Sequence, residues 1–526
     1  MNDVTGSPDS PKAIPPKRIW PFHPILFAAY PVISLYSRNT ALFPAEDLWR
    51  PLGILVLIGA ALWAILTPIF RSIDRAALAT SVAVVGFFSF GPLLDVLHDS
   101  HSRDNYDPTS TFWPWLAGYL VVVIAACWKW KARGALTKGL NAAAAVLTLI
   151  PAASIVLAWA QGHRAVPVAS ASSPNSNYKG PRPDIFYVIL DGYGRSDALR
   201  RDMNFDNSAF IDGLKKRGFY VADSGHTNYC QTELSLTSSL NMGFLPDVVP
   251  KFKPDEQDRG ILDILIDENR VSQELRGLGY KYIAITTNFP AVHPNSADLV
   301  ISESRGGTLL EAAIMNRTAL PSGGQAESQF DSRRENLQAA IQTVGHLGSQ
   351  GSQPRFIFAH ILAPHPPFVF GPNGEPIRPK HMFAIVDGSH FYQNGGNHEE
   401  YRAGYTGQAQ TISRLMLAAI DDLLKREATP PIIVVQGDHG PKMRYDQELL
   451  ARTDINEVFP NLNAYFVPAA VKAKLYPTIT PVNSFRTILR EQFGENFPNL
   501  PDRSWYSSWT WPFRLEEVTD RISPKL

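Results

Sequence analysis

Long apolar runs fill the first third of the chain, and charged residues are sparse inside them. Each of five such stretches approaches the ~20 residues that a helix needs to cross the apolar core of a bilayer. They cover Trp20–Tyr36, Pro51–Phe70, Ala76–Leu97, Phe112–Trp128 and Leu140–Ala160. The first is the weakest, because His23, Pro24 and Pro31 interrupt it. We therefore predict five transmembrane helices within residues 20–162.

Basic residues are concentrated in every second connection between these stretches. If the N-terminus lies inside the cell, the inner segments carry Lys12, Lys17, Arg18, Arg71, Arg75, Lys129, Lys131, Arg133 and Lys138. The outer connections hold Arg38, Arg50 and Arg103. Cytoplasmic loops are the ones enriched in Lys and Arg. We therefore predict a cytoplasmic tail at residues 1–19, a multi-pass protein of the bacterial cytoplasmic (inner) membrane, and a C-terminal part on its periplasmic or extracellular side.

The pattern changes after the fifth stretch. Residues 163–182 are rich in Ser, Pro, Ala and Asn without periodicity, which is typical of a linker. Short apolar runs then indicate buried strands at Asp184–Leu190, Lys281–Thr286, Arg355–His360 and Ile432–Val435. Amphipathic helices are predicted at Asn207–Arg217, Ile264–Leu278, Arg333–Val344 and Arg402–Lys425. Residues 183–526 are thus predicted to form an α/β domain with a largely parallel central sheet, joined to the N-terminal five-helix transmembrane bundle.

The overall composition adds two exclusions. Lys and Arg together number 49, as do Asp and Glu, so no bulk charge points to nucleic acid as a partner. The two cysteines are Cys127 in an apolar run and Cys230 in the C-terminal part, so they are not expected to meet. A disulfide framework is therefore excluded as the source of stability.

Candidate metal ligands follow two of the predicted strands. Asp191 comes directly after the first strand, and Asp438 and His439 follow the last one. In parallel sheets, ligands gather beyond the carboxyl ends of the strands. Each motif has a plainer interpretation, since Asp-Gly is a common turn and Asp-His-Gly occurs in ordinary loops. Together, two carboxylates and an imidazole favour zinc or manganese over calcium.

Two further segments supply candidates for catalysis. The hydroxyl-rich run with Thr232 is predicted to begin a helix, where an anion is favoured and where a metal-activated hydroxyl acts as nucleophile. The alternative is that these hydroxyls cap and pack the helix. Pro364 and Pro366 flank His365, which is predicted to bind a substrate phosphate, protonate a leaving oxygen or ligate a second metal. His360 is either a substrate-binding residue or a hydrogen-bonded core residue.

The order of these segments resembles the alkaline phosphatase superfamily. Its elements here are Asp191 after a strand, Thr232 at a helix start, His365 in a proline-flanked loop, and Asp438-His439 after a second strand. More narrowly, the chain is similar to the sulfatase-like membrane branch that contains lipoteichoic acid synthases and phosphoethanolamine transferases. The specific part of the resemblance spans residues 184–440. It implies an enzyme with an extracytoplasmic catalytic domain behind five membrane spans.

Carried over residue by residue, the resemblance implies that Asp191, Thr232, Asp438 and His439 bind a divalent metal. Thr232 would attack phosphorus and form a phospho-threonine intermediate, while His365 would face the substrate. The implied activity is that of a phospho-headgroup transferase of the phosphoethanolamine or phosphoglycerol type. A membrane lipid would be the donor, and a cell-envelope lipid or glycan the acceptor.

Three departures from the family pattern keep alternatives open. The first ligand is glutamate in the two transferase families and aspartate here, as in many hydrolases, so a sulfatase-like phosphodiesterase or phosphatase is the alternative. Cys230 lacks the following proline and arginine of a formylglycine sulfatase. No histidine occurs within Pro441–Asn461, so we expect one metal, Zn or Mn, rather than two. A catalytically silent envelope-assembly protein is a third alternative, against which the metal-binding residue types argue.

Overall fold

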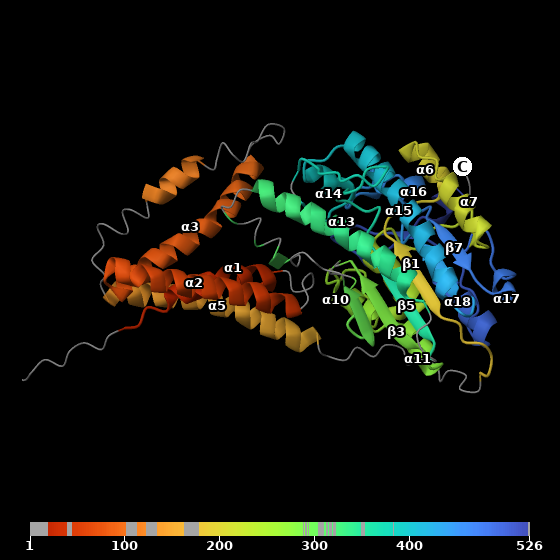
Figure 1. Cartoon of the computed structure of the whole chain (residues 1–526), viewed down its shortest axis with the longest axis horizontal. Coiled ribbons are helices and arrows are strands. Elements are labelled where there is room, and N and C mark those ends of the chain that lie inside the picture. Colours follow the sequence, from red (N-terminus) through yellow and green to blue (C-terminus); the bar gives the residue numbers. More distant parts are fainter. Residues whose placement is uncertain are drawn as a thin grey trace, which may run out of the picture. The chain divides into compact units, whose positions relative to one another are not determined.

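Two compact units make up the chain, one built mainly from the N-terminal helices and one from the residues after them. The structure is a computed structural model (Figure 1). It describes residues 19–38, 45–100, 113–121, 134–162, 178–302 and 310–523, with gaps at 288, 290–291, 293, 312–313, 315–317, 319–321, 349–352 and 382. Most of the predicted linker at 163–182 lies outside the described residues.

The first unit is helical. Its elements are α1 (His23–Ser37), the 3-10 turn η1 (Ala45–Leu48), α2 (Trp49–Phe70), α3 (Ile73–Ser100) and α5 (Gly134–Gly162). Among the described residues, three segments are long and apolar enough to cross a membrane, namely Trp49–Phe70, Ile73–Phe90 and Gly134–Leu157. Large apolar side chains such as Leu57 (71% exposed) and Ile69 (66% exposed) lie on the surface of α2. An apolar surface of this kind is typical of contact with lipid.

The first predicted span is a shorter helix than expected. With 15 residues, α1 is about 22 Å long, against the ~30 Å of a bilayer core. It packs against α2 and α3, and the side-chain oxygen of Asn141 accepts hydrogen bonds from the backbone N–H groups of Phe22 and His23 (3.1 and 3.0 Å). Of the fourth predicted span only residues 113–121 are described, and these are helical. The structure therefore shows three candidate spans, and the count of five stays a prediction.

A seven-stranded sheet organises the second unit. Its strands are β1 (Ile185–Leu190), β2 (Tyr220–Val221), β3 (Lys281–Thr286), β4 (Leu299–Ser302), β5 (Arg355–Ile361), β6 (Ile432–Gln436) and β7 (Asn463–Phe466). They are arranged in the order β2-β7-β6-β1-β5-β3-β4. The five strands from β6 to β4 are parallel, whereas β7 runs antiparallel to both of its neighbours. The prediction of a largely parallel central sheet is confirmed.

Helices lie between most of these strands. They are α6 (Ser196–Met203), α7 (Ser208–Lys216), α8 (Thr232–Asn241), α9 (Leu245–Val248), α10 (Gly260–Asp267), α11 (Arg270–Gly277), α13 (Ser322–His346), α14 (Gly388–Gln393), α15 (His398–Arg426), α16 (Ile455–Val458), α17 (Ala469–Lys472) and α18 (Pro481–Phe493). A small hairpin of β8 (Trp505–Tyr506) and β9 (Glu516–Glu517) and the 3-10 turns η3 (Leu450–Arg452) and η4 (Thr519–Arg521) complete the described elements. The single helix predicted at Ile264–Leu278 is two helices, because the side chain of Asn269 accepts a hydrogen bond from Ser272 N–H (2.8 Å) and begins α11.

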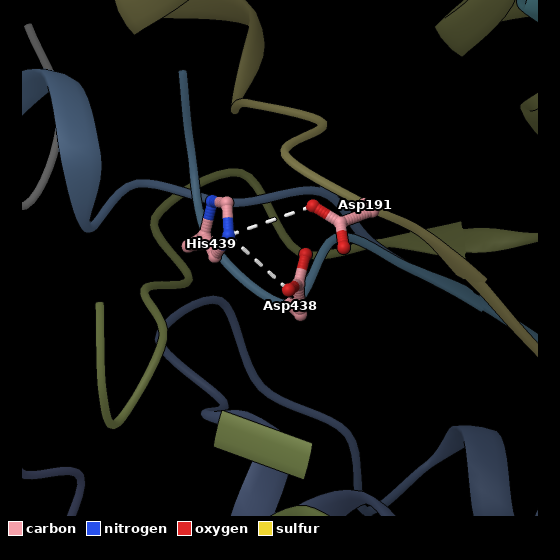
Figure 2. Close-up of side chains that lie close together, drawn as sticks. All are labelled: Asp191, Asp438 and His439. Atoms are coloured by element: carbon pink, nitrogen blue, oxygen red, sulfur yellow. Dashed lines mark ion pairs between the residues drawn. The ribbon is translucent and has the colours of Figure 1, made fainter. Parts of the chain in front are cut away.

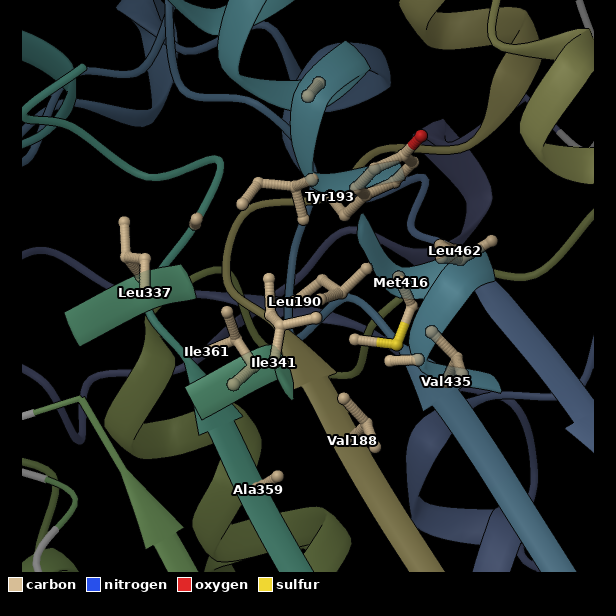
Figure 3. Close-up of a cluster of buried hydrophobic side chains, with 14 of the residues drawn as sticks. Val188, Leu190, Tyr193, Leu337, Ile341, Ala359, Ile361, Met416, Val435 and Leu462 are labelled. Carbon is tan, nitrogen blue, oxygen red and sulfur yellow. The ribbon is translucent and has the colours of Figure 1, made fainter. Parts of the chain in front are cut away.

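Strand β1 is buried on both faces. Its alternate side chains enter two different hydrophobic clusters, one shared with α13 and α15 and the other with α8, α11 and α18. On the first face, Val188 and Leu190 lie near Leu337 and Ile341 of α13 and Met416 of α15 (Figure 3). This double burial explains the continuous apolar run in the sequence. It also fixes the carboxyl end of β1 in the middle of the sheet.

Candidate metal centre and active site

The carboxyl ends of β1 and β6 bring three predicted ligands together. Asp191 directly follows β1, and Asp438 and His439 follow β6 after a single glycine. Because β1 and β6 are parallel neighbours, these side chains meet at one edge of the sheet (Figure 2). The Nε2 atom of His439 is 3.6 Å from Asp191 Oδ1 and 3.2 Å from Asp438 Oδ2. All three residues are buried.

Two carboxylate oxygens of this group lack a partner. Among the residues that the structure describes, Asp191 Oδ1 and Asp438 Oδ2 have no hydrogen bond, although both atoms are buried. The Nδ1–H group of His439 donates to the carbonyl of Gly440 (2.8 Å), so Nε2 turns its lone pair toward the same two oxygens. Ligands about 2 Å from a tetrahedral ion lie ~3.3 Å apart, close to the separations seen here. The three residues therefore fit a divalent cation.

Without a cation, the group of Asp191, Asp438 and His439 carries unbalanced negative charge. Burial, and after it the charge of Asp438, raises the pKa of Asp191 to about 7. Burial and then the charge of Lys442 hold the pKa of His439 well below its ordinary value, so the ring is neutral and able to act as a ligand. Two buried carboxylates this close repel each other. A divalent cation would offset that repulsion, which makes the charge pattern consistent with the geometry.

Two glycines allow the ligand-bearing loops to approach each other. Gly192 has a φ of +77°, which a side chain would strain, and its N–H donates to Asp438 Oδ1 (2.9 Å). At Gly437, a Cβ atom would lie 2.2 Å from the carbonyl oxygen of Tyr193. A side chain at Gly437 would push the two loops apart, and one at Gly192 would strain the backbone next to Asp191. The Asp-Gly and Gly-Asp-His motifs are therefore needed for the site's geometry.

Thr232 is the first residue of α8, and it is buried beside the ligand group. Its Oγ1 lies 3.2 Å from His439 Nε2 and 3.4 Å from Asp191 Oδ2. Gln231, just before it, donates from Nε2 to the carbonyl of Ser507 (2.8 Å), which ties the start of α8 to the C-terminal segment. The predicted helix start is confirmed. Its hydroxyl stands at the edge of the candidate metal centre, at a helix N-terminus that favours an anion.

His365 lies close to the ligand group but outside it. Its backbone N–H donates to the carbonyl of Asp191 (3.1 Å), and Gln408 Nε2 donates to the carbonyl of His365 (3.1 Å). Its ring is fixed by a hydrogen bond from Nδ1 to the carbonyl of Pro366 (2.5 Å). The remaining nitrogen, Nε2, is 3.7 Å from Asp387 Oδ2. The imidazole is therefore oriented by its surroundings, with Nε2 on the side of Asp387.

His360 supports one of the ligands. Its Nε2 is 3.1 Å from Asp191 Oδ2, and the residue is 1% exposed. Burial lowers the pKa of His360 to about 4, so the neutral ring donates this hydrogen bond at physiological pH. This is the geometry of the hydrogen-bonded core residue, the second of the two alternatives from the sequence. A direct contact between His360 and substrate stays a prediction.

Sequence reasoning missed Asp387 and the residues that hold it. Asp387 is buried, and the hydroxyl of Tyr401 donates to its Oδ1 (2.7 Å). Burial alone would raise the pKa of Asp387, but the charges of His365 and Lys442 and the hydrogen bond from Tyr401 outweigh it and lower the pKa. The carboxylate is therefore charged, and its Oδ2 faces Nε2 of His365.

Two buried cations near the site were also missed. Lys442 is 6% exposed and follows His439 closely in the chain. Arg333 of α13 is 5% exposed and donates to the carbonyl of Leu362, in the turn after β5. Burial lowers the pKa of Arg333 to about 10, so it keeps its charge at neutral pH. Its charge and that of Asp191 attract each other.

The surroundings of Cys230 do not suit a nucleophile. The thiol is fully buried, and its Sγ lies 3.8 Å from the hydroxyl of Tyr445. Burial raises the pKa of Cys230, which disfavours the thiolate. Together with the missing sulfatase motif, this leaves Thr232 as the better-placed nucleophile.

Comparison with known proteins gives distant structural likenesses. No family model matches the sequence, and no curated protein matches it. The chain is similar to the C-terminal periplasmic domain of EptC from Escherichia coli in complex with Zn, with a TM-score of 0.43 and 12% identity over 68% of this chain and 97% of that one.

Two other solved structures are similar. The integral membrane lipooligosaccharide phosphoethanolamine transferase A (EptA) from Neisseria meningitidis matches with a TM-score of 0.36 and 11% identity, over 89% of this chain and 94% of that one. The phosphonate monoester hydrolase of Agrobacterium radiobacter matches with a TM-score of 0.39 and 14% identity, over 60% and 74%. By their names, two of these proteins are enzymes, a phosphoethanolamine transferase and a phosphonate monoester hydrolase. The likenesses are too distant to establish chemistry, which depends on the site itself.

Proposed function

We propose that this chain is a membrane-anchored, metal-dependent phospho-headgroup transferase that acts through a phospho-threonine at Thr232. The observation that carries the proposal is the position of the Thr232 hydroxyl, 3.2 Å from Nε2 of His439 and beside the two unpartnered carboxylate oxygens. Asp191, Asp438 and His439 would hold one divalent metal, zinc or manganese, with Thr232 as a further ligand. When bound, such a metal lowers the pKa of a coordinated hydroxyl and offsets the charge of the phosphoryl group.

Different groups of the site carry out separate steps of the phosphoryl transfer. Thr232 Oγ1, whose proton has passed to solvent, attacks phosphorus, and the bond from phosphorus to the lipid alcohol breaks. The N-terminus of α8 presents backbone N–H groups to the anionic phosphoryl oxygens. His365 is oriented to give a proton to the leaving oxygen, because its ring is fixed through Nδ1 and exposes Nε2. In the second half, an acceptor hydroxyl gives its proton to His365 and attacks phosphorus, and the bond from phosphorus to Thr232 Oγ1 breaks, so that Thr232 leaves as the alkoxide.

The candidate membrane spans are evidence for a lipid as the donor of the phosphoryl group. A lipid donor stays within the bilayer, so an enzyme that uses it has to be held at the membrane surface. The three candidate spans provide such an anchor. We further propose five spans in the bacterial inner membrane, with residues 183–526 on the periplasmic or extracellular side. The phosphoryl group would pass to a lipid or glycan of the cell envelope.

One observation favours hydrolysis as the second candidate. The first ligand, Asp191, is an aspartate, as in many hydrolases of the resembled superfamily. In that case water replaces the acceptor hydroxyl, and the same phospho-threonine is hydrolysed. The residues of the metal centre serve both reactions equally. The acceptor therefore decides between a transferase and a phosphodiesterase.

The experiment uses the full chain, purified in detergent and loaded with zinc or manganese. Phosphatidylethanolamine and phosphatidylglycerol with fluorescent acyl chains are supplied as donors, with and without an envelope glycolipid. The proposal predicts metal-dependent release of fluorescent diacylglycerol, accelerated by the acceptor. Release at the same rate without an acceptor supports the hydrolase. Intact donors in the presence of bound metal would contradict a lipid phosphodiester as substrate.

A further inference from the structure

The first unit contains a cavity of about 640 Å³. Its walls come from α1, α3, α5 and the helical segment 113–121, and twelve described residues line it. Protein interiors hold few voids larger than a water molecule. A space of this size instead falls within the range of about 300–1,000 Å³ that is typical of ligand sites. The cavity is therefore a candidate binding site inside the helical unit.

Two stacked aromatic rings form one wall of the cavity. The ring centres of Trp115 and Tyr119 are 5.3 Å apart, with 8° between the ring planes. Trp115 Nε1 donates to Ser89 Oγ (3.2 Å), and the hydroxyl of Tyr119 donates to the carbonyl of Ala83 (3.1 Å). A Cβ atom at Gly86 would lie 1.9 Å from Cε2 of Tyr119, so glycine is needed for this ring to lie against α3. The polar atoms of both rings are thus bound to α3, and their apolar surfaces are left for a ligand.

The other polar side chains of the wall also have partners within the chain. The hydroxyl of Ser89 donates to the carbonyl of Gly86 (2.7 Å), and Ser81 Oγ is hydrogen-bonded to Nδ1 of His23 (2.6 Å). The eight remaining lining residues, among them Phe27 and Leu140, carry no polar side-chain atom. Large apolar cavities exclude water and take up apolar ligands. The chemistry of the wall therefore fits a hydrocarbon.

The dimensions of the cavity match one leaflet of a bilayer. Along α3 the lining runs from Leu78 to Ser89, which is ~16 Å of helix, or about half of the ~30 Å hydrocarbon core. The cavity also opens on the surface of the unit, where Val85 is 51% exposed and Pro114 and Gly118 are exposed as well. Because α3 contains a candidate membrane span, this opening would face the lipid chains.

We propose that the first unit binds one acyl chain of a membrane phospholipid in the cavity between α1, α3, α5 and the segment 113–121. These helices would then hold a specific lipid as well as anchor the chain. The proposal does not depend on phosphoryl transfer, because every residue that carries it belongs to the first unit. The alternative is that lipid covers the cavity no more tightly than it covers the rest of the apolar surface.

The test counts the phospholipids that stay bound to the full chain after exchange into detergent, by native mass spectrometry. Gly118→Leu fills the cavity, because Gly118 lines it and a Cβ atom there meets no neighbouring described atom within 4 Å. Gly53→Leu is the matched control, since Gly53 of α2 has the same free space but does not line the cavity. Val85→Trp blocks the opening, and Val146→Trp on α5 is its control, at 56% exposure against 51%.

We expect one retained phospholipid per wild-type chain, and the same in Gly53→Leu and Val146→Trp. Gly118→Leu and Val85→Trp should lose it. Dioleoylphosphatidylglycerol added to the delipidated chain should raise the melting temperature of the wild type by roughly 3 °C or more, because a ligand that binds only the folded chain stabilises it. The melting temperature of Gly118→Leu should not change. Dioleoylglycerol should act like the phospholipid, because the cavity binds the acyl chain.

Equal retention of lipid in Gly118→Leu, Val85→Trp and the wild type would overturn the proposal. A wild-type chain with neither a retained lipid nor a lipid-dependent rise in melting temperature would overturn it as well, and a rise that requires the headgroup would contradict an acyl-chain site. If one of the two variants fails to fold, the other decides with its own control. Loss of phosphodiester turnover would refute the proposed function and leave this lipid site standing.

Discussion

The hydroxyl oxygen of Thr232 lies 3.2 Å from Nε2 of His439, although 207 positions separate the two residues in the chain. Two other hydroxyls explain how they are kept together. Those of Thr227 and Ser235, on either side of Thr232, both donate to the backbone carbonyl of Asp438 (2.5 and 2.8 Å). The segment that begins α8 is thus fastened to the loop after β6. This junction holds the candidate nucleophile beside the candidate ligands Asp438 and His439.

Thr232→Ala is expected to reduce phosphodiester turnover about a thousandfold or more, because it removes the attacking oxygen. Metal binding should weaken but stay detectable, since three ligands remain. Turnover of a p-nitrophenyl phosphodiester and metal content by mass spectrometry check the two effects. Turnover near the wild-type level would move the nucleophile to water or to Cys230.

Thr237→Ala is the matched control for this prediction. Thr237 is a second buried threonine on the same helix, and its Oγ1 contacts the carbonyl of Leu262 (3.4 Å). The substitution removes the same atoms from α8 without touching the ligand group. It should cost stability comparable to that lost in Thr232→Ala but leave turnover intact.

Asp438→Asn is expected to have opposite effects on metal binding and on the stability of the metal-free protein. The substitution removes a charged ligand, so affinity for zinc or manganese should fall about a hundredfold or more. In chelator, it should raise the free energy of unfolding by ~1–2 kcal/mol, because it ends the repulsion between Asp191 and Asp438 and gives His439 Nε2 a donor. Thermal unfolding with and without chelator measures both. A lower melting temperature in chelator would contradict the account of the charges.

His360→Asn is expected to lower metal affinity about 10–100-fold, because the hydrogen bond from Nε2 to Asp191 Oδ2 orients that ligand. The KM for a diester should change less than the metal affinity. Titration with zinc under competition from a chelator measures the first, and steady-state kinetics the second. A raised KM at saturating metal, with metal affinity unchanged, would instead support the predicted substrate contact.

The lowered pKa of His226 predicts how folding stability depends on pH. Burial lowers the pKa of His226 below its ordinary value of 6.5, and its Nδ1 lies 2.8 Å from the hydroxyl of Ser504. As pH falls through about 6.5, the unfolded chain takes up a proton that the folded chain refuses, so folding stability decreases. Each unit of lowering is worth about 1.4 kcal/mol.

His226→Gln removes this contribution. We expect the melting temperature of the wild type to fall more steeply than that of the variant between about pH 7.5 and about pH 5.5. Because other buried histidines contribute equally to both proteins, the difference between the two curves reports His226 alone. Parallel curves would refute the prediction.

The sequence carried enough information to place the candidate metal ligands. Asp191 and the pair Asp438-His439 each follow a continuous apolar run, and the carboxyl ends of parallel strands meet at one edge. The helix start at Thr232 was likewise predicted from its hydroxyl-rich run. Apolar runs and helix starts are local features of the sequence. The rule that the carboxyl ends of parallel strands share one edge of the sheet then brings the residues together, whatever the loops do.

Asp387, Tyr401 and Lys442 could not be assigned in the same way. Asp387 does have a local signal, since the apolar residues 383–386 precede an Asp-Gly pair much as β1 precedes Asp191-Gly192, but no regular strand forms there. Tyr401 is one of the two tyrosines on α15, and the packing of that helix selects it. Lys442 was distinguishable from a solvated lysine only through its burial.

The metal content of the full chain, purified in detergent, tests the central claim most directly. It is measured beside Asp438→Ala, with p-nitrophenyl phosphodiester turnover recorded on the same samples. We predict about one zinc or manganese per wild-type chain, and loss of both metal and turnover in the variant. A wild-type chain that holds no metal and stays inert with zinc, manganese and magnesium would contradict the account.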